Sequence, residues 1–365
     1  MSDRPHFPDL DGLRAFAAFA VVFYHSALWL AFPDALWADR LRHVLSFGGT
    51  GGPLGVTFFF VLSGFLITYL MLAERQRTGH FRIGRFYMRR ILRIWPLYYA
   101  TLIVGALVCH EPLAMDQGLH GASPSFPLYA AFLANFDHIR HGEPACGIMG
   151  VQWSVCVEEQ FYLLWPVFFL VFGRRRLLPL AILALGAFAV WYTFHDPEPL
   201  VRYYHLIPNM RYLACGGLLA CLVHRWPDVI SACLRSIPTW GHSVIYLVWL
   251  AALFFGSALP FGALRTVLLS HGPMLFFTYV LAHQTLGTVG WLHVRHLPWI
   301  GHLGRISYGL YLIHMIPIFL ISRMVTSPDS FWYTVPLAML CTVLLSEFSY
   351  RYLESPFLRL KSRFG

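Results

Sequence analysis

The stretch "DLDGLRAFAAFAVVFYHSALWL", residues 9–30, begins with two aspartates and then becomes apolar enough to cross a membrane. A helix that spans the hydrocarbon core needs about 20 mostly apolar residues. Arg14 lies at the start of this run and His25 lies inside it. Eleven helical residues make three turns plus about 20°, so the two side chains share a face, about 16 Å apart along the axis. One elongated ligand can therefore contact both, although they cannot contact each other.

The composition indicates a membrane protein. Of the 365 residues, 57% are hydrophobic and 12% are charged, against about 25% charged in ordinary soluble domains. A soluble core of this size cannot bury so much apolar surface, whereas lipid accepts it directly. The net charge of +9 does not indicate a nucleic-acid partner, because the basic residues lie between apolar segments, where they set topology or contact anionic lipid.

Apolar runs of near-spanning length predict an all-α integral membrane protein, a bundle of about ten transmembrane helices. Asp9 and Asp11 precede the first run and no cleavage site follows it, so the run is not a cleaved signal peptide. We expect one domain over residues 1–365, with no soluble appended domain. The predicted spans are 12–32, 54–73, 95–110, 153–172, 177–194, 206–224, 243–259, 265–285, 304–322 and 333–353.

The charges between these spans predict the orientation. Loop 74–94 carries seven arginines, the turn 174–176 is "RRR", and the C-terminal tail is basic. Loop 111–152 is acidic by comparison. Because cytoplasmic loops are enriched in arginine and lysine, we expect both termini in the cytoplasm and loop 111–152 outside. The segment 126–136 is apolar but too short to span, and we expect it in the interface.

The cysteines give no sign of a metal site. There are seven, scattered mainly through apolar runs and without paired metal-ligand spacing. We therefore expect small buried side chains rather than metal ligands, and no bound metal.

Ionisable residues inside spans are costly in lipid and mark candidate functional positions. Arg90 and Arg93 lie on one helical face, and clustered guanidinium groups suit phosphate or pyrophosphate. Glu158 and Glu159 point about 100° apart, so at least one faces a polar interior. The other interpretations are snorkelling or lipid-binding arginines, and a glutamate that only pairs with an arginine.

A polar stripe follows one predicted helix near the C-terminus. Ser307, Tyr308, Tyr311 and His314 fall at i, i+1, i+4 and i+7, a spacing that places most of them on one side of the helix. The stripe is either part of a functional site or a set of hydrogen bonds between helices.

Six stretches together resemble the membrane-bound acyltransferase family 3, in the family's order and over essentially the whole chain. The first four are "DGLRAFAAFAVVFYH", "FFFVLSGFLIT", "RRILRIWPLYY" and "WSVCVEEQFYLLWP", and "ISYGLYLIH" and "YRYLESPF" complete the set. The resemblance implies a multi-pass enzyme of the bacterial inner membrane. It transfers an acyl group, commonly acetyl, from cytoplasmic acyl-CoA to a hydroxyl of a cell-surface polysaccharide or glycolipid.

The same resemblance implies roles for individual residues. His25 matches the catalytic histidine, Arg14 its paired arginine, and Glu158 the glutamate of the fourth-helix block. Arg90 and Arg93 match the second arginine motif, and Glu354 matches a motif residue whose role is open.

The residues and the resemblance agree on a mechanism. Arginines at the membrane surface hold the phosphates of coenzyme A, and its arm reaches inward to His25. His25 acts as general base on the acceptor hydroxyl, with Glu158 fixing its tautomer, or carries the acyl group itself. The sequence does not separate these two routes, nor does it give the acyl chain, the acceptor or the oligomeric state. A glycan or lipid exporter is the alternative function, and a lipid-binding scaffold a third.

Overall fold

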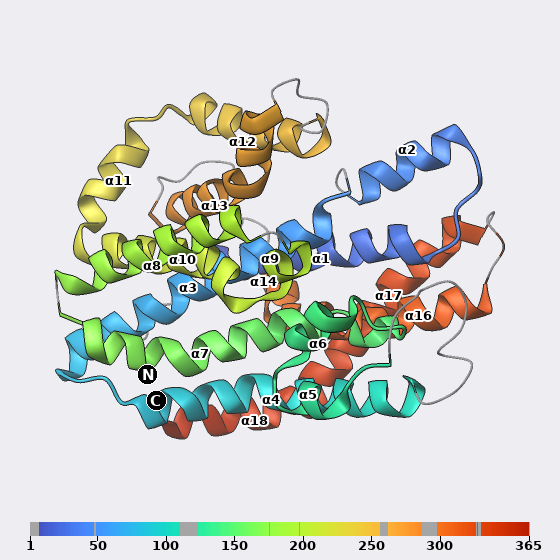
Figure 1. Cartoon of the computed structure of the whole chain (residues 1–365), viewed down its shortest axis with the longest axis horizontal. Helices are drawn as coiled ribbons and strands as arrows, with labels where there is room; N and C mark the ends of the chain where they lie inside the picture. Colours follow the sequence, from blue (N-terminus) through green and yellow to red (C-terminus); the bar gives the residue numbers. More distant parts are fainter. Residues whose placement is uncertain are drawn as a thin grey trace.

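The structure is a computed structural model that describes residues 7–46, 49–109, 123–174, 176–196, 198–255, 262–286, 298–325, 327 and 330–364. Within these ranges the regular elements are all helices, without a β-strand (Figure 1). The predicted all-α class is confirmed.

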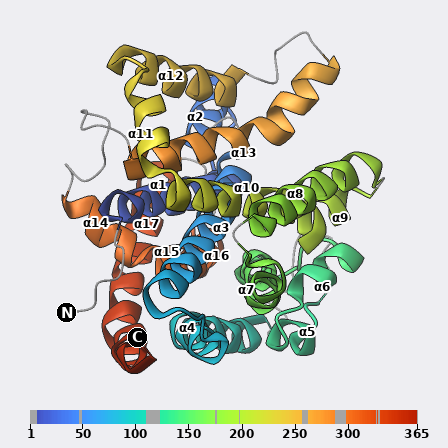
Figure 2. The ribbon, with the colours of Figure 1, turned by 90° about the vertical axis from the view of Figure 1, so that its left-hand side faces the viewer.

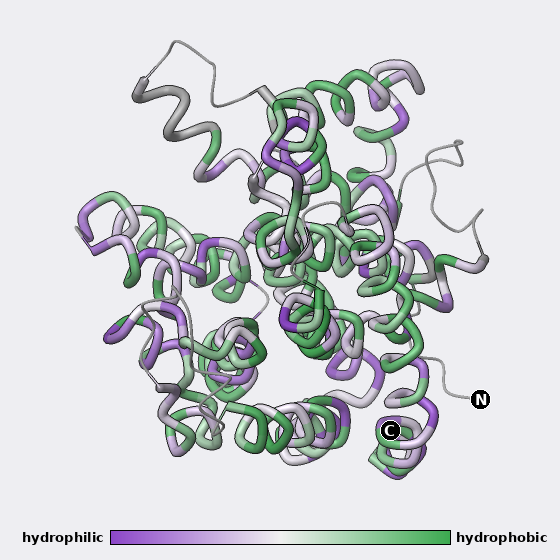
Figure 3. The backbone as a smooth tube through the Cα atoms, turned by 90° about the vertical axis from the view of Figure 1, so that its right-hand side faces the viewer, coloured by the Kyte–Doolittle hydropathy of each residue, from purple (hydrophilic) through white to green (hydrophobic). Residues whose placement is uncertain are grey.

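Eight helical segments among the described residues are long and apolar enough to cross a membrane. Figure 3 shows hydrophobic residues along much of these helices. Many large apolar side chains on α7 and α8 point outward, as expected for surfaces that face lipid. The segments are α1 (Pro8–Trp29), α3 (Gly51–Thr78), α4 (Ile83–Cys109), η2 (Gly147–Met149) with α7 (Gln152–Phe172), α8 (Leu177–His195), α9 (Pro199–Tyr204) with α10 (Leu206–Arg225), α15 (Ser307–Ile313) with α16 (Met315–Met324), and α17 (Phe331–Ser349) with its C-terminal extension.

The other two predicted spans correspond to α12 (Thr239–Phe255) and α13 (Gly262–Leu286). α12 has 17 described residues, and residues 256–259 of the predicted span 243–259 lie outside the described ranges. The count of ten spans therefore stays a prediction.

The remaining helices are short and connect or cap the long ones. The predicted interfacial segment 126–136 forms two short helices that pack on the protein, with Tyr129 fully buried. The short helices are α2 (Leu36–Leu45), α5 (Phe126–Ala130), α6 (Ala134–His141), α11 (Pro227–Arg235), α14 (Pro298–Arg305), η6 (Tyr350–Glu354), α18 (Ser355–Leu360) and η7 (Lys361–Phe364).

Helix α3 lies in the middle of the bundle, between α1 and α10 on one side and α4 and α7 on the other (Figure 2). Its contact with α10 depends on glycine. A Cβ on Gly64 would lie 1.9 Å from the backbone oxygen of Leu213, and one on Gly216 would lie 1.9 Å from that of Val61. Small residues allow this close backbone approach between membrane helices.

Both ends of the described chain lie at one end of the bundle. The guanidinium of Arg89, near the start of α4, donates to the backbone oxygen of Phe364 at 2.9 Å and to Glu74 near the end of α3 at 2.8 Å. The first turn of α1 lines a cavity together with Lys361. The two described ends of the chain thus lie at the same end of the bundle; the cytoplasmic location of both termini stays a prediction.

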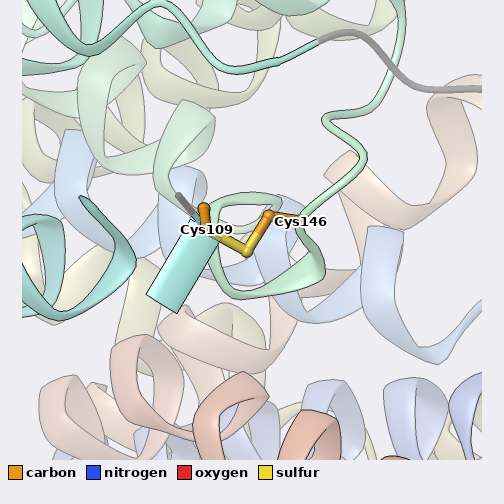
Figure 4. The surroundings of a disulfide bond; sticks show 2 residues. All are labelled: Cys109 and Cys146. Carbon is orange, nitrogen blue, oxygen red and sulfur yellow. A yellow bond between two sulfur atoms is a disulfide. The ribbon is translucent and has the colours of Figure 1, made fainter. Parts of the chain in front are cut away.

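A disulfide marks the opposite end of the bundle (Figure 4). Cys109, the last residue of α4, is bonded to Cys146, just before η2. The prediction that the cysteines are simply small buried side chains is wrong for this pair, although it holds for Cys156 and Cys221. The error arose because the two cysteines are 37 residues apart in the sequence, and nothing local to either cysteine indicates its partner.

The predicted span 304–322 is interrupted at its centre. α15 ends at Ile313, α16 begins at Met315, and His314 stands between them. Pro317 has no backbone N–H and its ring crowds the carbonyl of Ile313, four residues earlier, which disrupts the helix there. The backbone of His314 keeps helical angles at this break, and its imidazole is fully buried in the interior.

Candidate functional site

Three neighbouring cavities run through the bundle in series. The proximal cavity, at the end where the termini lie, has a volume of about 680 Å³; the middle cavity has about 100 Å³ and the distal cavity about 220 Å³. Arg14, Arg90 and Arg93 line both the proximal and the middle cavity. Val56 and Tyr311 line both the middle and the distal cavity. The series thus leads from the termini toward the disulfide end.

The proximal cavity is strongly cationic. Seven arginines and Lys361 line it, against the carboxylates of Asp11 and Glu74. Both carboxylates are engaged, Asp11 with Arg14 at 2.9 Å and Glu74 with Arg89 at 2.8 Å. A large excess of positive charge remains, which suits a ligand that carries several phosphate groups. The seven arginines are Arg14, Arg77, Arg82, Arg85, Arg89, Arg90 and Arg93.

Arg90 is held in place by aromatic rings rather than by a carboxylate. Its guanidinium carbon lies 5.6 Å from the ring centre of Phe86 and 5.5 Å from that of Tyr162. Its Nε is buried and has no hydrogen-bond partner among the described atoms. A buried donor without a partner is costly, so this atom fits an anionic ligand group at the junction of the proximal and middle cavities.

The carboxylate of Glu158 lies in the middle cavity. It accepts hydrogen bonds from Ser63 at 2.6 Å and from Tyr162 at 3.2 Å. Its neighbour Glu159 points elsewhere and accepts from the indole of Trp95 at 3.1 Å. The two carboxylates therefore diverge as helical geometry predicted. The sequence suggested that Glu158 accepts a hydrogen bond from His25. In the structure its carboxylate accepts from Ser63 and Tyr162 instead.

His25 lines the distal cavity and contacts a second histidine instead. Its Nδ1 lies 3.0 Å from Nε2 of His314 and 3.0 Å from the backbone oxygen of Val21. Nδ1 of His314 lies 2.7 Å from the backbone oxygen of Tyr311. A carbonyl oxygen only accepts, so His314 carries its proton on Nδ1, and Nδ1–H of His25 is shared between the backbone oxygen of Val21 and Nε2 of His314. Nε2 of His25 is then unprotonated and can act as a base or nucleophile.

Tyr311 stands between the middle and distal cavities. Its hydroxyl contacts the hydroxyl of Ser154 at 2.5 Å and donates to the backbone oxygen of Val151 at 3.3 Å. Its ring packs edge-on against Phe59. These contacts fix the side chain where the middle and distal cavities adjoin.

The distal cavity differs in character. Aromatic rings line it, with His141 and Glu143 as its ionisable side chains beside His25. Residues of the predicted outer loop 111–152 form one wall, including Gly147 and Gly150; residues 110–122 of that loop lie outside the described ranges. Aromatic rings with a few polar groups are typical of sites that bind small polar molecules. The rings belong to Tyr24, Trp29, Trp153, Tyr203 and Tyr311.

The structure brings most of the predicted site residues together. Ser307 and Tyr308 line the middle cavity, and the hydroxyl of Tyr308 donates to the backbone oxygen of Ile94 at 2.9 Å. Glu354 lies in η6 outside the three cavities, where it is buried, accepts from Ser349 at 3.2 Å and interacts electrostatically with Arg93. Its position thus connects the C-terminal segment to the arginine motif.

Sequence analysis missed several residues of the site. Ser63 and Tyr162 were not singled out, although Tyr162 follows Glu158 by four residues, the spacing at which helical side chains meet. The contact between His25 and His314 spans 289 residues, and nothing in a single sequence indicates such a pairing.

Comparisons with known proteins identify the family of the chain. The sequence matches the family described as acyltransferase domain over residues 7–350. It is 28% identical, over 97% of its length, to the peptidoglycan O-acetyltransferase OatA of Listeria monocytogenes. It is 29% identical over 96% to the putative peptidoglycan O-acetyltransferase YrhL of Bacillus subtilis, and 26% identical over 96% to the O-acetyltransferase OatA of Staphylococcus aureus.

The match covers 56%, 55% and 57% of these three relatives, so the chain spans about half of their length. No solved structure matches the chain.

Proposed function

The chain belongs to the acyltransferase family, and from that premise we propose that it is a membrane O-acyltransferase. It transfers an acyl group, in the first instance acetyl, from cytoplasmic acyl-CoA to a hydroxyl of a cell-wall or other cell-surface polysaccharide or glycolipid. The peptidoglycan named for two relatives is the leading acceptor class. We place the protein in the bacterial cytoplasmic membrane, with both termini inside and the distal cavity outside.

One observation carries the proposal: half-buried His25 lines the distal cavity, which shares Val56 and Tyr311 with the middle cavity. The middle cavity in turn shares Arg14, Arg90 and Arg93 with the proximal cavity. Coenzyme A carries its phosphates at one end and its thioester at the other end of a flexible arm. When the phosphates bind in the proximal cavity, the arm extends through the middle cavity. The thioester carbonyl then reaches the level of His25.

The tautomer of His25 defines the chemistry. Nε2 takes the proton of the acceptor hydroxyl, the oxygen attacks the thioester carbonyl, and the carbon–sulfur bond breaks to release the coenzyme A thiolate. The imidazolium that forms keeps its Nδ1–H on His314, which stabilises the charge. The proton then passes to the thiolate. In the covalent variant, Nε2 itself attacks the carbonyl, the carbon–sulfur bond breaks and coenzyme A leaves as its thiolate. The acceptor hydroxyl then attacks the acyl-imidazolium, its proton passes to the thiolate, and the bond from the acyl group to Nε2 breaks to regenerate neutral His25.

Glu158 has a different role in this arrangement from the one that the sequence suggested. Together with Ser63 and Tyr162 it forms a polar wall in the middle cavity, where it interacts electrostatically with Arg90 and Arg14. In our proposal, Glu158 positions those arginines and the arm of the donor. His314, and not Glu158, orients the imidazole of His25.

The test uses the full chain in phospholipid vesicles with acetyl-CoA on the side of the termini. We expect release of free coenzyme A that depends on a glycan acceptor on the opposite side and is lost in His25→Ala. Matched His195→Ala, an exposed histidine on α8, should behave as wild type. Movement of the glycan across the membrane without an ester product would contradict the proposal and support the exporter function instead. Trapping of an acylated His25 in the absence of acceptor separates the covalent route from the direct one.

A further inference from the structure

A fourth cavity lies at the same end of the bundle as the proximal cavity, between α3, α8 and α10. Its volume is about 620 Å³. Arg75, Arg174 and Arg225 line it together with His224, and no carboxylate does so among the described residues. We call it the lateral cavity. It plays no part in the proposed acyl transfer, which leaves its positive charge unexplained.

Half of the lateral cavity is apolar. Side chains of α3, α8 and the end of α10 form this part, and exposed Trp226 closes it at the end of α10. A ligand that fits both parts has an anionic group beside a hydrocarbon portion. Tryptophan is enriched where membrane meets water, so the cavity is at the level of lipid headgroups. The apolar lining residues are Leu72, Leu178, Pro179, Cys221 and Leu222.

The arginine at the centre of this cavity is held in one orientation. Arg75 donates to the backbone oxygen of Gly173 and lies 5.9 Å from the ring centre of Phe169. A Cβ on Gly173 would stand 2.2 Å from the backbone oxygen of Phe169 and 2.8 Å from Nη1 of Arg75, so the glycine leaves room for the backbone turn and for the guanidinium. Gly173 is also the C-cap of α7, and Arg174 follows it directly. The guanidinium of Arg75 is thus held in place, and the exposed side chain of Arg174 lines the same cavity.

We propose that the lateral cavity binds the headgroup phosphate of an anionic phospholipid, with Arg75 and Arg174 on the phosphate and the apolar wall along the start of its acyl chains. Basic cavities between membrane helices on the cytoplasmic side suit such headgroups. This inference is independent of the proposed function. Because Gln76 and His224 line both the lateral and the proximal cavity, the bound lipid would lie beside the donor site.

The experiment titrates the delipidated full chain with phosphatidylglycerol and with phosphatidylcholine, and counts bound lipid by native mass spectrometry. We expect phosphatidylglycerol to bind more tightly. Each arginine near a lipid surface contributes about fivefold to affinity, so Arg174→Gln should weaken binding about fivefold and Arg75→Gln with Arg174→Gln about 30-fold. Arg323→Gln, on α16 at the end of the bundle away from this cavity, is the matched control and should bind as wild type. Arg174 is exposed, so its single substitution tests the site without disturbing the fold.

Three results would overturn the proposal. The first is equal affinity for the two lipids, and the second is unchanged binding in the arginine variants. The third is displacement of the lipid by inorganic phosphate or by acetyl-CoA at their own binding concentrations. Displacement by phosphate would show a site for a free anion, and displacement by acetyl-CoA would show an extension of the donor site.

Discussion

The two ends of the cavity series are built from different chemistry. The proximal end is lined by seven arginines and a lysine. The distal end is lined by aromatic rings and glycines, with one wall tied to α4 by the disulfide between Cys109 and Cys146. The proximal end suits a phosphorylated donor, and the distal end suits an uncharged, hydroxyl-bearing acceptor. Under the proposed function, this contrast corresponds to two substrates that enter from opposite sides and meet at His25.

Removal of the imidazole of His25 should have the largest effect on turnover. We expect His25→Ala to lower kcat by about 10²–10⁴, the usual contribution of a general base, while the affinity for acyl-CoA stays unchanged. Donor binding by calorimetry and turnover by thiol release measure the two quantities separately. Loss of donor binding together with turnover would show that His25 supports the proximal end instead of joining the two.

His314 should come next, because it accepts the hydrogen bond that fixes His25. Hydrogen bonds to charged groups contribute about 1.5–3 kcal/mol, so His314→Ala should lower kcat about 10- to 100-fold with little change in either KM. His314→Gln offers an amide oxygen to Nδ1–H of His25 and should restore part of the rate. The pH profile of kcat is the readout that a merely structural role would not move, and an unchanged profile in both variants would remove the positioning role.

Arg90 and Arg93 test the proximal end alone. Each substitution to glutamine should raise KM for acyl-CoA about tenfold, since each removes a charge-assisted contact to phosphate. KM for the acceptor and kcat at saturating donor should stay close to wild type. Arg42→Gln, at the end of α2 and paired with Asp39, is the control. A rise in the acceptor KM instead would show that the assignment of the two ends is reversed.

The sequence predicted one end of this series better than the other. Arg14, Arg90 and Arg93 were found because charge in an apolar helix is costly, a rule that needs no knowledge of the fold. The helices themselves were predicted from apolar length, and α3, α7 and α10 begin within a few residues of expectation. These predictions rest on local properties of the chain.

The distal end could not be predicted in this way. Its parts come from segments far apart in the chain: His25 with His314, and Cys109 with Cys146. Tyr24, Trp153 and Tyr203 look like any aromatic residues of apolar helices until the fold places them around one cavity. Long-range packing, not local pattern, decides which polar residues meet there.

The disulfide offers a test restricted to the distal end. Cys109→Ser with Cys146→Ser removes a cross-link between residues 37 positions apart. The resulting gain in entropy of the unfolded chain should lower the free energy of unfolding by about 3–4 kcal/mol. Because the segment after Cys146 lines the distal cavity, the acceptor KM should rise a few-fold while the donor KM stays constant. Cys233→Ser, an exposed free cysteine, is the control. Thermal denaturation and two-substrate kinetics measure both effects, and an equal change in the donor KM would count against separate ends.

The smallest effect concerns the pH dependence of stability, which we test at the distal end on His138. Burial lowers the pKa of His138 in α6 to about 4, although Asp137 beside it acts in the opposite direction. Tyr129 contacts Nε2 of this ring at 2.9 Å and Tyr204 packs against it, while Nδ1 is buried without a partner among the described atoms. The unfolded segment takes up a proton near pH 6.5, so the stability of α5 and α6 falls as the pH drops from about 6.5 to 4, by about 1.4 kcal/mol per pH unit at most.

Hydrogen exchange at pH 7 and pH 5 should show faster opening of residues 126–141 at the lower pH, after correction for intrinsic rates. His138→Gln should lose this response and exposed His141→Gln should keep it. A similar acceleration at residues 176–180, at the proximal end, would mean that the whole bundle loosens and that His138 is not the cause.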